Sequence, residues 1–503
     1  MKKRQVVLII LDGWGHSEAK EFNAIYEAKT PNFEKYWDQY PHSLLHASGE
    51  SVGLPNGQMG NSEVGHMTIG AGRPIDTDLI RISKVVKENK LAEAEAIAKL
   101  FEHVLKYDST LHVQGLIGPG GVHSHSDHLY GFLKEAKLAG IEKIAIHAFT
   151  DGRDTPPQSA SKYLKELEEV LDELGMGFIA TATGRFFAMD RDGNWERLEK
   201  AEKAIFEGKG KEVKDQKPSE ILERLYLEGK MDEHIEPIVF LDPNGKSYSI
   251  ENNDGIFFFN YRADRARMFS EKILEKVQEK NLFFVSMTNY DDKFKASVAF
   301  PPVQIETTLA NEISKAGLKQ VHIAETEKFA HATYFLNGGR QEPHENEEDI
   351  LIESSKHVLT HDLAPKMKAK EIADTAVEKI KEGAEFIFIN FANADMIGHT
   401  ANKEALLETL EEVDFQLQRV VQCAENNGAV AVITADHGNA EMYFDQIENV
   451  KHTSHTTNRV PFILTDKNVM LKEEGNLYDI APTVLELLGL ERPAFMTGES
   501  VII

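Results

Sequence analysis

Cysteine is nearly absent from this sequence: Cys423 stands alone in 503 residues. An intrachain disulfide is therefore excluded, and a lone thiol is typical of a protein from a reducing compartment. Long apolar runs are missing as well. The run Val6–Leu11 ends at Asp12 and is too short for a signal-peptide core or a membrane span. We therefore expect a cytoplasmic protein that does not bind a membrane.

Basic side chains are scarce relative to acidic ones. The sequence has 56 lysines and arginines against 82 aspartates and glutamates, so its formal net charge is −26. So acidic a surface repels a phosphate backbone, and we do not expect nucleic acid as a partner. A small anionic substrate fits only where arginines cluster. The 41% of apolar and 27% of charged residues are typical of a globular chain and exclude a disordered or collagen-like one.

The sequence does contain a regular alternation of strand-like and helix-like segments. Apolar runs typical of buried parallel strands occur at 6–11, 111–117, 144–149, 178–182, 256–259, 321–324, 386–391 and 429–435. Apolar residues at helical spacing from Leu406 to Ala424 predict a helix that Gly428 terminates. The pattern indicates two α/β domains with mostly parallel sheets. Glycine- and proline-containing connectors at 70–74 and 300–302 predict that roughly residues 75–305 are inserted into another domain.

Reactive side chains follow several of these strands. Asp12, Asp395 and Asp436 each come at or just after a strand end, and ligands of open α/β sheets bind at that edge. His399, His437 and either His452 or His455 add imidazoles, and spacing alone does not choose between the last two. Carboxylate and imidazole together suit Mn²⁺, Zn²⁺, Fe or Co, and six ligands suffice for two metal ions. Any single Asp-Gly pair after a strand also fits an ordinary turn.

A serine lies between glycines at the predicted start of a helix. Ser62 could present its oxygen to an anion, and a nearby metal would favour its alkoxide. The alternative is a structural N-cap serine in a glycine-rich turn, which this segment alone favours.

Basic residues follow strands in the middle of the chain and beyond. They are Arg153, Arg185, Arg191, Arg262, Arg265 and Lys328. Arginine forks match carboxylate and phosphate oxygens, so the group predicts an anionic substrate, whereas any one of them alone fits a surface ion pair. The loop containing His123, His125 and His128 fits either a further metal site or a single substrate-facing histidine.

Metals, a serine and arginines together suggest phosphoryl transfer through a phosphoserine. The sequence here resembles the cofactor-independent phosphoglycerate mutases of the alkaline phosphatase superfamily over essentially its whole length. The resemblance rests on the motifs LDGWG (11–15), GNSEVGH (60–66), GGVHSH (120–125), DGRDT (151–155), NYRADR (260–265), ETEKFAH (325–331), DMIGH (395–399) and TADHGNAE (434–441). Ala394, Arg459 and Pro119 depart from the family pattern but remove no expected ligand.

The resemblance implies a role for each site residue. Ser62 would be the nucleophile, and Asp154 would act as general acid and base between the two glycerate hydroxyls. One metal would be held by Asp12, Ser62, Asp436 and His437, and the other by Asp395, His399 and His455. Both are expected to be Mn²⁺. Phosphoglycerate would be bound by His123, Arg153, Asp154, Arg185, Arg191, Arg262, Arg265 and Lys328.

The resemblance also implies an architecture. Residues 1–76 and 308–503 would form an alkaline-phosphatase-like metal-binding domain, and 77–307 an inserted transferase-like domain that binds substrate. Closure of the domains would exclude water, which separates a mutase from a phosphatase. We expect a monomer that interconverts 3- and 2-phosphoglycerate in glycolysis and gluconeogenesis. The alternatives are a metal-dependent phosphomonoesterase of the same superfamily, and a non-enzymatic protein that binds divalent metal or phosphate.

Overall fold

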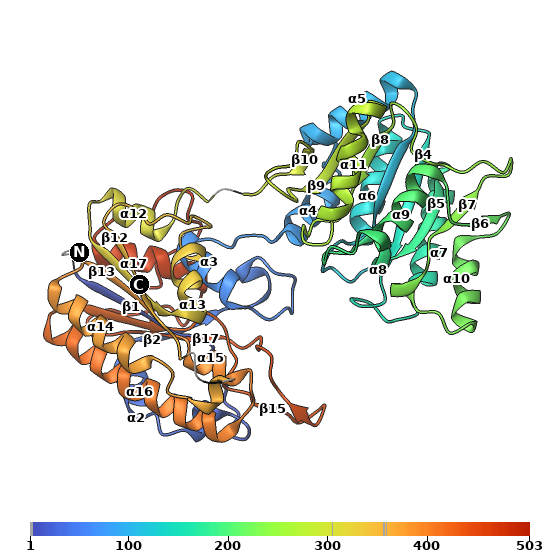
Figure 1. The fold of residues 1–503 in the computed structure, drawn as a ribbon. Coiled ribbons are helices and arrows are strands. Elements are labelled where there is room, and N and C mark those ends of the chain that lie inside the picture. The colour runs from blue at the N-terminus through green and yellow to red at the C-terminus, as the bar shows by residue number, and fades with distance from the viewer. Residues whose placement is uncertain (1–3, 304, 356–357, 359) are drawn as a thin grey trace. The chain divides into compact units, whose positions relative to one another are not determined.

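The computed structural model describes residues 4–303, 305–355, 358 and 360–503. The chain divides into two compact units, Met1–Thr77 with Gln304–Ile503, and Asp78–Val303. The second unit is thus an insertion into the first. Each unit is built around one eight-stranded, mostly parallel sheet with helices on both faces, as the alternation of strands and helices predicts (Figure 1).

The sheet of the first unit has five parallel strands at its centre and one edge. Its order is β12 (Glu347–Ile352), β11 (Gln320–Glu325), β13 (Phe386–Phe391), β1 (Val6–Leu11), β14 (Val430–Thr434), β17 (Val460–Leu464), β2 (His42–His46) and β18 (Glu474–Asn476). The run β12 to β14 is parallel, and β17 is antiparallel to both its neighbours. β1 consists of apolar residues only, because it is buried on both faces.

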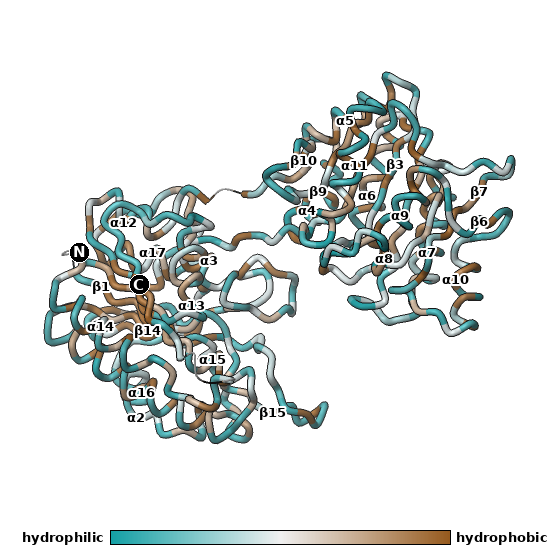
Figure 2. Tube along the Cα trace, in the orientation of Figure 1, coloured by the Kyte–Doolittle hydropathy of each residue, from teal (hydrophilic) through white to brown (hydrophobic). Residues whose placement is uncertain are grey.

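Helices cover both faces of this sheet. One face carries α14 (Ala369–Glu382) and α16 (Lys403–Asn426), with α1 (Ala24–Glu27) and α2 (Pro31–Gln39) packed on α16. The other carries α3 (Ser62–Ala71), α12 (Leu309–Lys315) and α17 (Ile480–Leu488). The helix predicted from Leu406 onward is α16, and it ends before Gly428 because Asn427 caps it. The strands form the apolar interior, and polar residues line the outer helix faces (Figure 2).

The second unit repeats this layering. Its sheet runs β10 (Ser297–Phe300), β9 (Phe283–Thr288), β8 (Gly255–Phe258), β3 (Leu111–Leu116), β4 (Ile144–Thr150), β5 (Phe178–Gly184), β7 (Ile238–Leu241) and β6 (Lys211–Lys214). Among the described strand pairs of this second sheet, only β5 and β7 are antiparallel. Two apolar clusters fill the two faces. One lies under α4 (Asp78–Lys87), α5 (Glu95–Tyr107), α6 (Ser126–Leu138), α7 (Ala160–Leu174) and α10 (Pro218–Leu227), the other under α8 (Arg185–Ala188), α9 (Trp195–Glu207) and α11 (Arg267–Lys280).

Within the part of the chain that the structure describes, no helix is both long and apolar enough to cross a membrane.

Candidate active site

Three parallel strands of the first unit lead into acidic residues at one edge of the sheet. Asp12 follows β1, Asp395 follows β13 within α15 (Asn393–Gly398), and Asp436 follows β14. All three carboxylates are buried. Gly13 has φ +76°, and a Cβ there would lie 2.7 Å from Cα of Asp395. A glycine is therefore required for the loop after β1 to approach α15 so closely.

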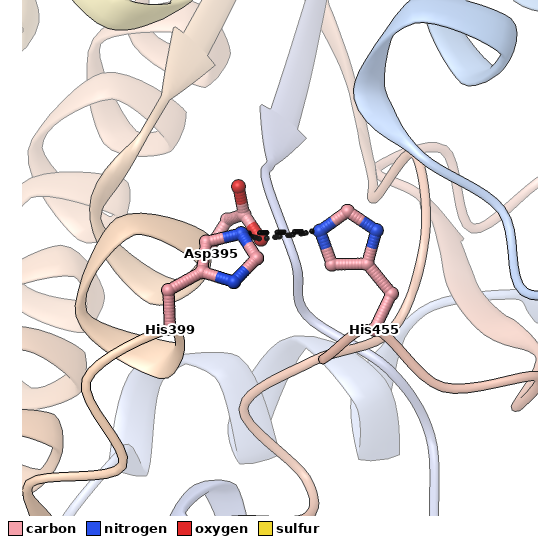
Figure 3. Close-up of side chains that lie close together, drawn as sticks. All are labelled: Asp395, His399 and His455. Atoms are coloured by element: carbon pink, nitrogen blue, oxygen red, sulfur yellow. Dashed lines mark hydrogen bonds and ion pairs between the residues drawn. The ribbon is translucent and has the colours of Figure 1, made fainter. Parts of the chain in front are cut away.

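The first group of metal-ligand side chains is Asp395, His399 and His455 (Figure 3). Oδ1 of Asp395 lies 3.3 Å from Nε2 of His399, one helical turn later, and 3.1 Å from Nε2 of His455. The two Nε2 atoms are 3.2 Å apart. His452 instead directs Nδ1 to the carbonyl of Met442. Of the two histidines that spacing leaves open, the structure brings His455 into the group.

The second group is Asp12, Asp436 and His437, and it includes Ser62. Nε2 of His437 lies 3.6 Å from Oδ1 of Asp12 and 3.4 Å from Oδ2 of Asp436. Oγ of Ser62 lies 3.3 Å from Oδ1 of Asp12 and 3.0 Å from Nε2 of His437. Ser62 begins α3, but Asn61 is the N-cap and accepts from the N–H of Val64. The N-cap interpretation of Ser62 is therefore wrong, and its hydroxyl is free to face the carboxylates.

Lys328 links the two groups. It follows β11 in α13 (Thr326–Ala330), and its buried ammonium lies 2.6 Å from Oδ1 of Asp12 and 2.7 Å from Oδ2 of Asp395. The same Nζ is 2.6 Å from Oγ of Ser62. Against the effect of burial, Asp12 and Asp395 raise the pKa of Lys328, so it is charged. Sequence reasoning assigned Lys328 to substrate; the structure brings it to the serine and both acidic groups.

Divalent metal ions fit these donors. Nδ1 of His399 and of His455 each face a backbone carbonyl, that of Thr453 and of Gly60, at 2.8 Å. A carbonyl only accepts, so each ring holds a proton on Nδ1, and Nε2 is the atom that could bind a metal, as in metal-binding histidines. Oδ2 of Asp436 is buried without a hydrogen-bond partner. Three carboxylates with one lysine leave negative charge that a cation would neutralise.

A second constellation lies at the strand ends of the inserted unit. Nη1 of Arg185, after β5, lies 2.6 Å from Oδ1 of Asp151 and 2.6 Å from Oδ2 of Asp154. Nε2 of His123 lies 3.9 Å from the same Oδ2 of Asp154. Burial, then the charge of Arg185, lowers the pKa of His123 to about 4, so the ring is neutral.

Two of the remaining arginines, Arg191 and Arg262, pair with Asp264. Its Oδ2 accepts from Nη1 of Arg191 at 2.8 Å, and its Oδ1 lies 3.1 Å from Nε of Arg262. Arg265 donates to the carbonyl of Met189. Burial lowers the pKa of Arg265, and the charges of Arg185, Arg191 and Arg153 lower it further. Arg153 is mostly exposed, with Glu233 as its ion-pair partner at 3.5 Å. Such a set of cations is suited to a multiply charged anion.

His123, His125 and His128, the last of which lies in the first turn of α6, do not form a metal site. Nδ1 of His125 accepts from the N–H of Asp127, and Nε2 of His128 pairs with the hydroxyl of Ser83. His123 alone faces the arginine and aspartate group. Of the two interpretations of this loop, the single site-facing histidine fits the structure.

Sequence reasoning missed several residues that hold the ligands in place. Asn390 donates to Oδ2 of Asp12 at 2.8 Å, and Asn439 donates to Oδ1 of Asp395 at 2.8 Å. Nδ1 of His66 faces the carbonyl of Ser62 at 2.9 Å. Asn390 could have been found from the sequence, because a polar amide inside the otherwise apolar strand β13 indicates a polar partner. Glu441 gave no such signal, since its partners Gly15, Thr456 and Asn458 are distant in the sequence.

Comparisons with known proteins identify a family, similar sequences and a similar fold. A protein-family model described as the metalloenzyme superfamily matches residues 4–492. The 2,3-bisphosphoglycerate-independent phosphoglycerate mutases of Listeria innocua and Clostridium acetobutylicum are each 45% identical to this chain, and both alignments cover 100% of either protein. A crystal structure of Leishmania mexicana phosphoglycerate mutase, solved at low cobalt concentration, is 28% identical with a TM-score of 0.62. It aligns with 100% of this chain and 98% of its own.

Proposed function

Since this chain belongs to the metalloenzyme superfamily and, within it, to the 2,3-bisphosphoglycerate-independent phosphoglycerate mutases, we propose how its residues carry out that family's reaction. Its activity is the interconversion of 3- and 2-phosphoglycerate, an isomerisation that needs no 2,3-bisphosphoglycerate. The observation that carries the mechanism is the position of Ser62, whose Oγ is within 3.3 Å of a lysine, a histidine and an aspartate.

We propose two divalent metal sites in the first unit. Asp12, Ser62, Asp436 and His437 would hold one ion, and Asp395, His399 and His455 the other. When bound, such ions lower the pKa of a coordinated hydroxyl and neutralise phosphate charge. The mixed oxygen and nitrogen donors suit Mn²⁺, which we propose as the metal.

Ser62 would be the nucleophile in the first half of the reaction. In its anionic form, Oγ forms a bond to phosphorus while the bond from phosphorus to the glycerate oxygen breaks. This gives phosphoserine and a glycerate oxygen that takes a proton from Asp154, and the second half of the reaction regenerates the anionic serine oxygen. Lys328, whose Nζ is 2.6 Å from Oγ, donates to this oxygen and favours its anionic form. An ammonium does not accept the serine proton, so the role of Lys328 is electrostatic.

Asp154 would transfer protons to and from the glycerate oxygens. As an acid it donates to the oxygen that loses phosphorus; as a base it removes the proton from the other hydroxyl, which then attacks phosphoserine. The cycle therefore returns Asp154 to its starting state. Arg185 donates to Oδ2 of Asp154 at 2.6 Å and so orients this carboxyl group.

The arginine group of the inserted unit would bind the carboxylate and phosphate of the substrate. Paired N–H groups of an arginine match either anion. The residues concerned are His123, Arg153, Arg185, Arg191, Arg262 and Arg265. In a chain of net charge −26, this cluster would also attract an anion that the rest of the surface repels.

We propose accordingly that 1–76 with 308–503 is the phosphatase-like catalytic domain and 77–307 the substrate-binding domain. We further propose that the enzyme is a monomer that acts in the cytoplasm.

Trapping the phosphoenzyme tests this mechanism. Enzyme mixed with ³²P-labelled 3-phosphoglycerate and quenched in acid should carry label on the peptide that contains Ser62. Ser62→Ala should fold, bind substrate and form no labelled peptide, with activity reduced by at least about 10³-fold. Ser51→Ala, on the same unit but outside both groups, is the matched control and should behave as wild type. Label on another residue, or activity in Ser62→Ala, would contradict the phosphoserine step.

A further inference from the structure

A third group of metal-ligand side chains lies within the sheet of the first unit, apart from the strand-end groups. It consists of His322 on β11 and of Glu347 and Asp349 on β12. The two strands are parallel neighbours, and His322 is opposite Asp349 in their register. Glu347 is two residues before Asp349 and therefore shares its face of the sheet. The register alone thus brings an imidazole and two carboxylates together.

The distances within this group are close to those around a bound ion. Nδ1 of His322 lies 3.2 Å from Oε1 of Glu347 and 3.7 Å from Oδ1 of Asp349. One ligand atom from each residue lies within 4.8 Å of the others. Metal–ligand bonds of about 2.0–2.2 Å hold neighbouring ligand atoms about 3–3.6 Å apart, so small side-chain movements would complete the site.

Burial leaves the group with unmet charge. The side chains of His322 and Glu347 are fully buried. Both ring nitrogens of His322 and Oδ1 of Asp349 lack a hydrogen-bond partner. Among the ion pairs of the residues that the structure describes, neither carboxylate has a lysine or arginine partner. Two buried carboxylates beside a neutral imidazole carry negative charge that a cation or a proton has to balance.

Protonation accounts for only part of that charge. Burial, then the neighbouring Glu347, raises the pKa of Asp349 to about 7, so this carboxyl loses its proton near neutral pH. Burial lowers the pKa of His322 against the raising effect of Glu347, so the ring is neutral and offers a lone pair.

Hydrogen bonds from the surrounding residues hold the carboxylate of Glu347 in place. Nδ2 of Asn337 donates to Oε1 of Glu347 at 2.6 Å, and the N–H of His344 donates to Oε2 at 2.7 Å. Hydrogen bonds of this kind fix ligating carboxylates and contribute to metal affinity. They also connect the segment 337–344 to β12.

We propose that His322, Glu347 and Asp349 bind a divalent transition-metal ion, of the class of Mn²⁺ or Zn²⁺, at a third site distinct from the two at the strand ends. One imidazole and two carboxylates suit such ions. The ion would tie β12, an edge strand, to β11, whose end leads into Lys328. Its role would be structural, and it does not depend on the mutase mechanism.

Metal stoichiometry tests the proposal. Asp395→Asn with Asp436→Asn removes a carboxylate from each strand-end group and serves as the background protein. Equilibrium dialysis against Mn²⁺ at about pH 7.5, followed by elemental analysis, should find one bound ion per chain in this background. Adding Asp349→Asn should weaken that binding by at least about 10-fold. Mn²⁺ should also raise the melting temperature of the background and lose this effect in the Asp349→Asn protein.

Glu348→Gln is the matched control, since Glu348 is the intervening residue on β12 and pairs with Lys379 instead. It should leave the bound ion unchanged. If Asp349→Asn does not fold, His322→Gln takes its place. The third site would be overturned if the background protein binds no Mn²⁺, or if neither Asp349→Asn nor His322→Gln alters the binding. A proton shared by the two carboxyl groups would then balance the charge of this cluster.

Discussion

At the scale of single residues, the main feature of the candidate site is an excess of buried negative charge. Asp12, Asp395 and Asp436 are buried, and the described residues place one ammonium, that of Lys328, among them. Against burial, Lys328 holds the pKa of Asp395 well below its usual range, so this carboxylate is ionised. Burial and Asp436 raise the pKa of Asp12 instead. One lysine thus lowers the pKa of Asp395, whereas the pKa of Asp12 stays raised. Because one ammonium does not neutralise all the carboxylates, the site is suited to bound cations.

The pH dependence of stability tests the electrostatics of one residue beside this site. Burial, then Glu327, raises the pKa of Glu325 from 4.5 to about 7. The folded state therefore holds this proton more tightly than the unfolded state, so the stabilisation is complete below pH 4.5 and is lost as the pH rises through about 7. Between about pH 5 and pH 8 the free energy of unfolding should fall by about 2 kcal/mol more in wild type than in Glu325→Gln.

Urea unfolding of chelator-treated protein at the two pH values measures this difference. Glu327→Gln is the companion variant, because it removes the neighbouring charge but keeps the buried Glu325 carboxyl. It should reduce the slope only in part. Equal pH dependence in wild type and Glu325→Gln would show that this carboxyl titrates normally.

At the scale of elements, the site depends on loops that meet from distant parts of the chain. Glu441 holds three of them. Its Oε2 accepts from the N–H of Gly15 at 3.1 Å and from the N–H of Asn439 at 2.8 Å. Its Oε1 accepts from the hydroxyl of Thr456 and from Nδ2 of Asn458. One buried carboxylate thereby joins the loops that carry Asp12, His437 and His455.

Glu441→Gln should therefore weaken metal binding although Glu441 is not in either ligand group. An amide keeps the shape but turns one acceptor into a donor that faces backbone N–H groups. We expect the Mn²⁺ affinity to fall by about 10-fold or more at both strand-end sites, with little change in secondary structure. Isothermal titration measures this, and Glu411→Gln, an exposed acidic position, is the control. Unchanged affinity would mean that the loops hold their positions without Glu441.

The packing of α3 gives a second element-scale prediction. A Cβ at Gly70 would lie 1.9 Å from the carbonyl oxygen of Leu336, in the segment that follows Lys328. A Cβ at Gly131 of α6 would meet a methyl group of Val86 at 2.6 Å. Backbone yields less than a side chain, so Gly70→Ala should cost about 3 kcal/mol of stability and Gly131→Ala about 1 kcal/mol. Thermal or urea unfolding compares them, and equal costs would contradict the close packing of α3.

At the scale of the whole molecule, the sequence predicts the features that depend on parallel strand pairing. Parallel strands share an edge, so the apolar runs alone suffice to place Asp12, Asp395 and Asp436 together. The role of Glu441 could not be predicted, because Gly15 lies 426 residues away and only the folded chain makes them neighbours. The choice between His452 and His455 likewise depended on a loop conformation. The inserted sheet was predicted as a second α/β unit, but the pairing of Arg185 with Asp151 was not.

The most direct test of the central claim is an enolase-coupled assay of 3-phosphoglycerate conversion with no bisphosphoglycerate added. Wild-type enzyme should lose activity after chelation and regain it with Mn²⁺, whereas Ser62→Ala should stay inactive in both states. Free phosphate released in place of 2-phosphoglycerate would make the protein a phosphatase. Full activity in the chelated enzyme, or in Ser62→Ala, would contradict a metal-dependent mutase that works through phosphoserine.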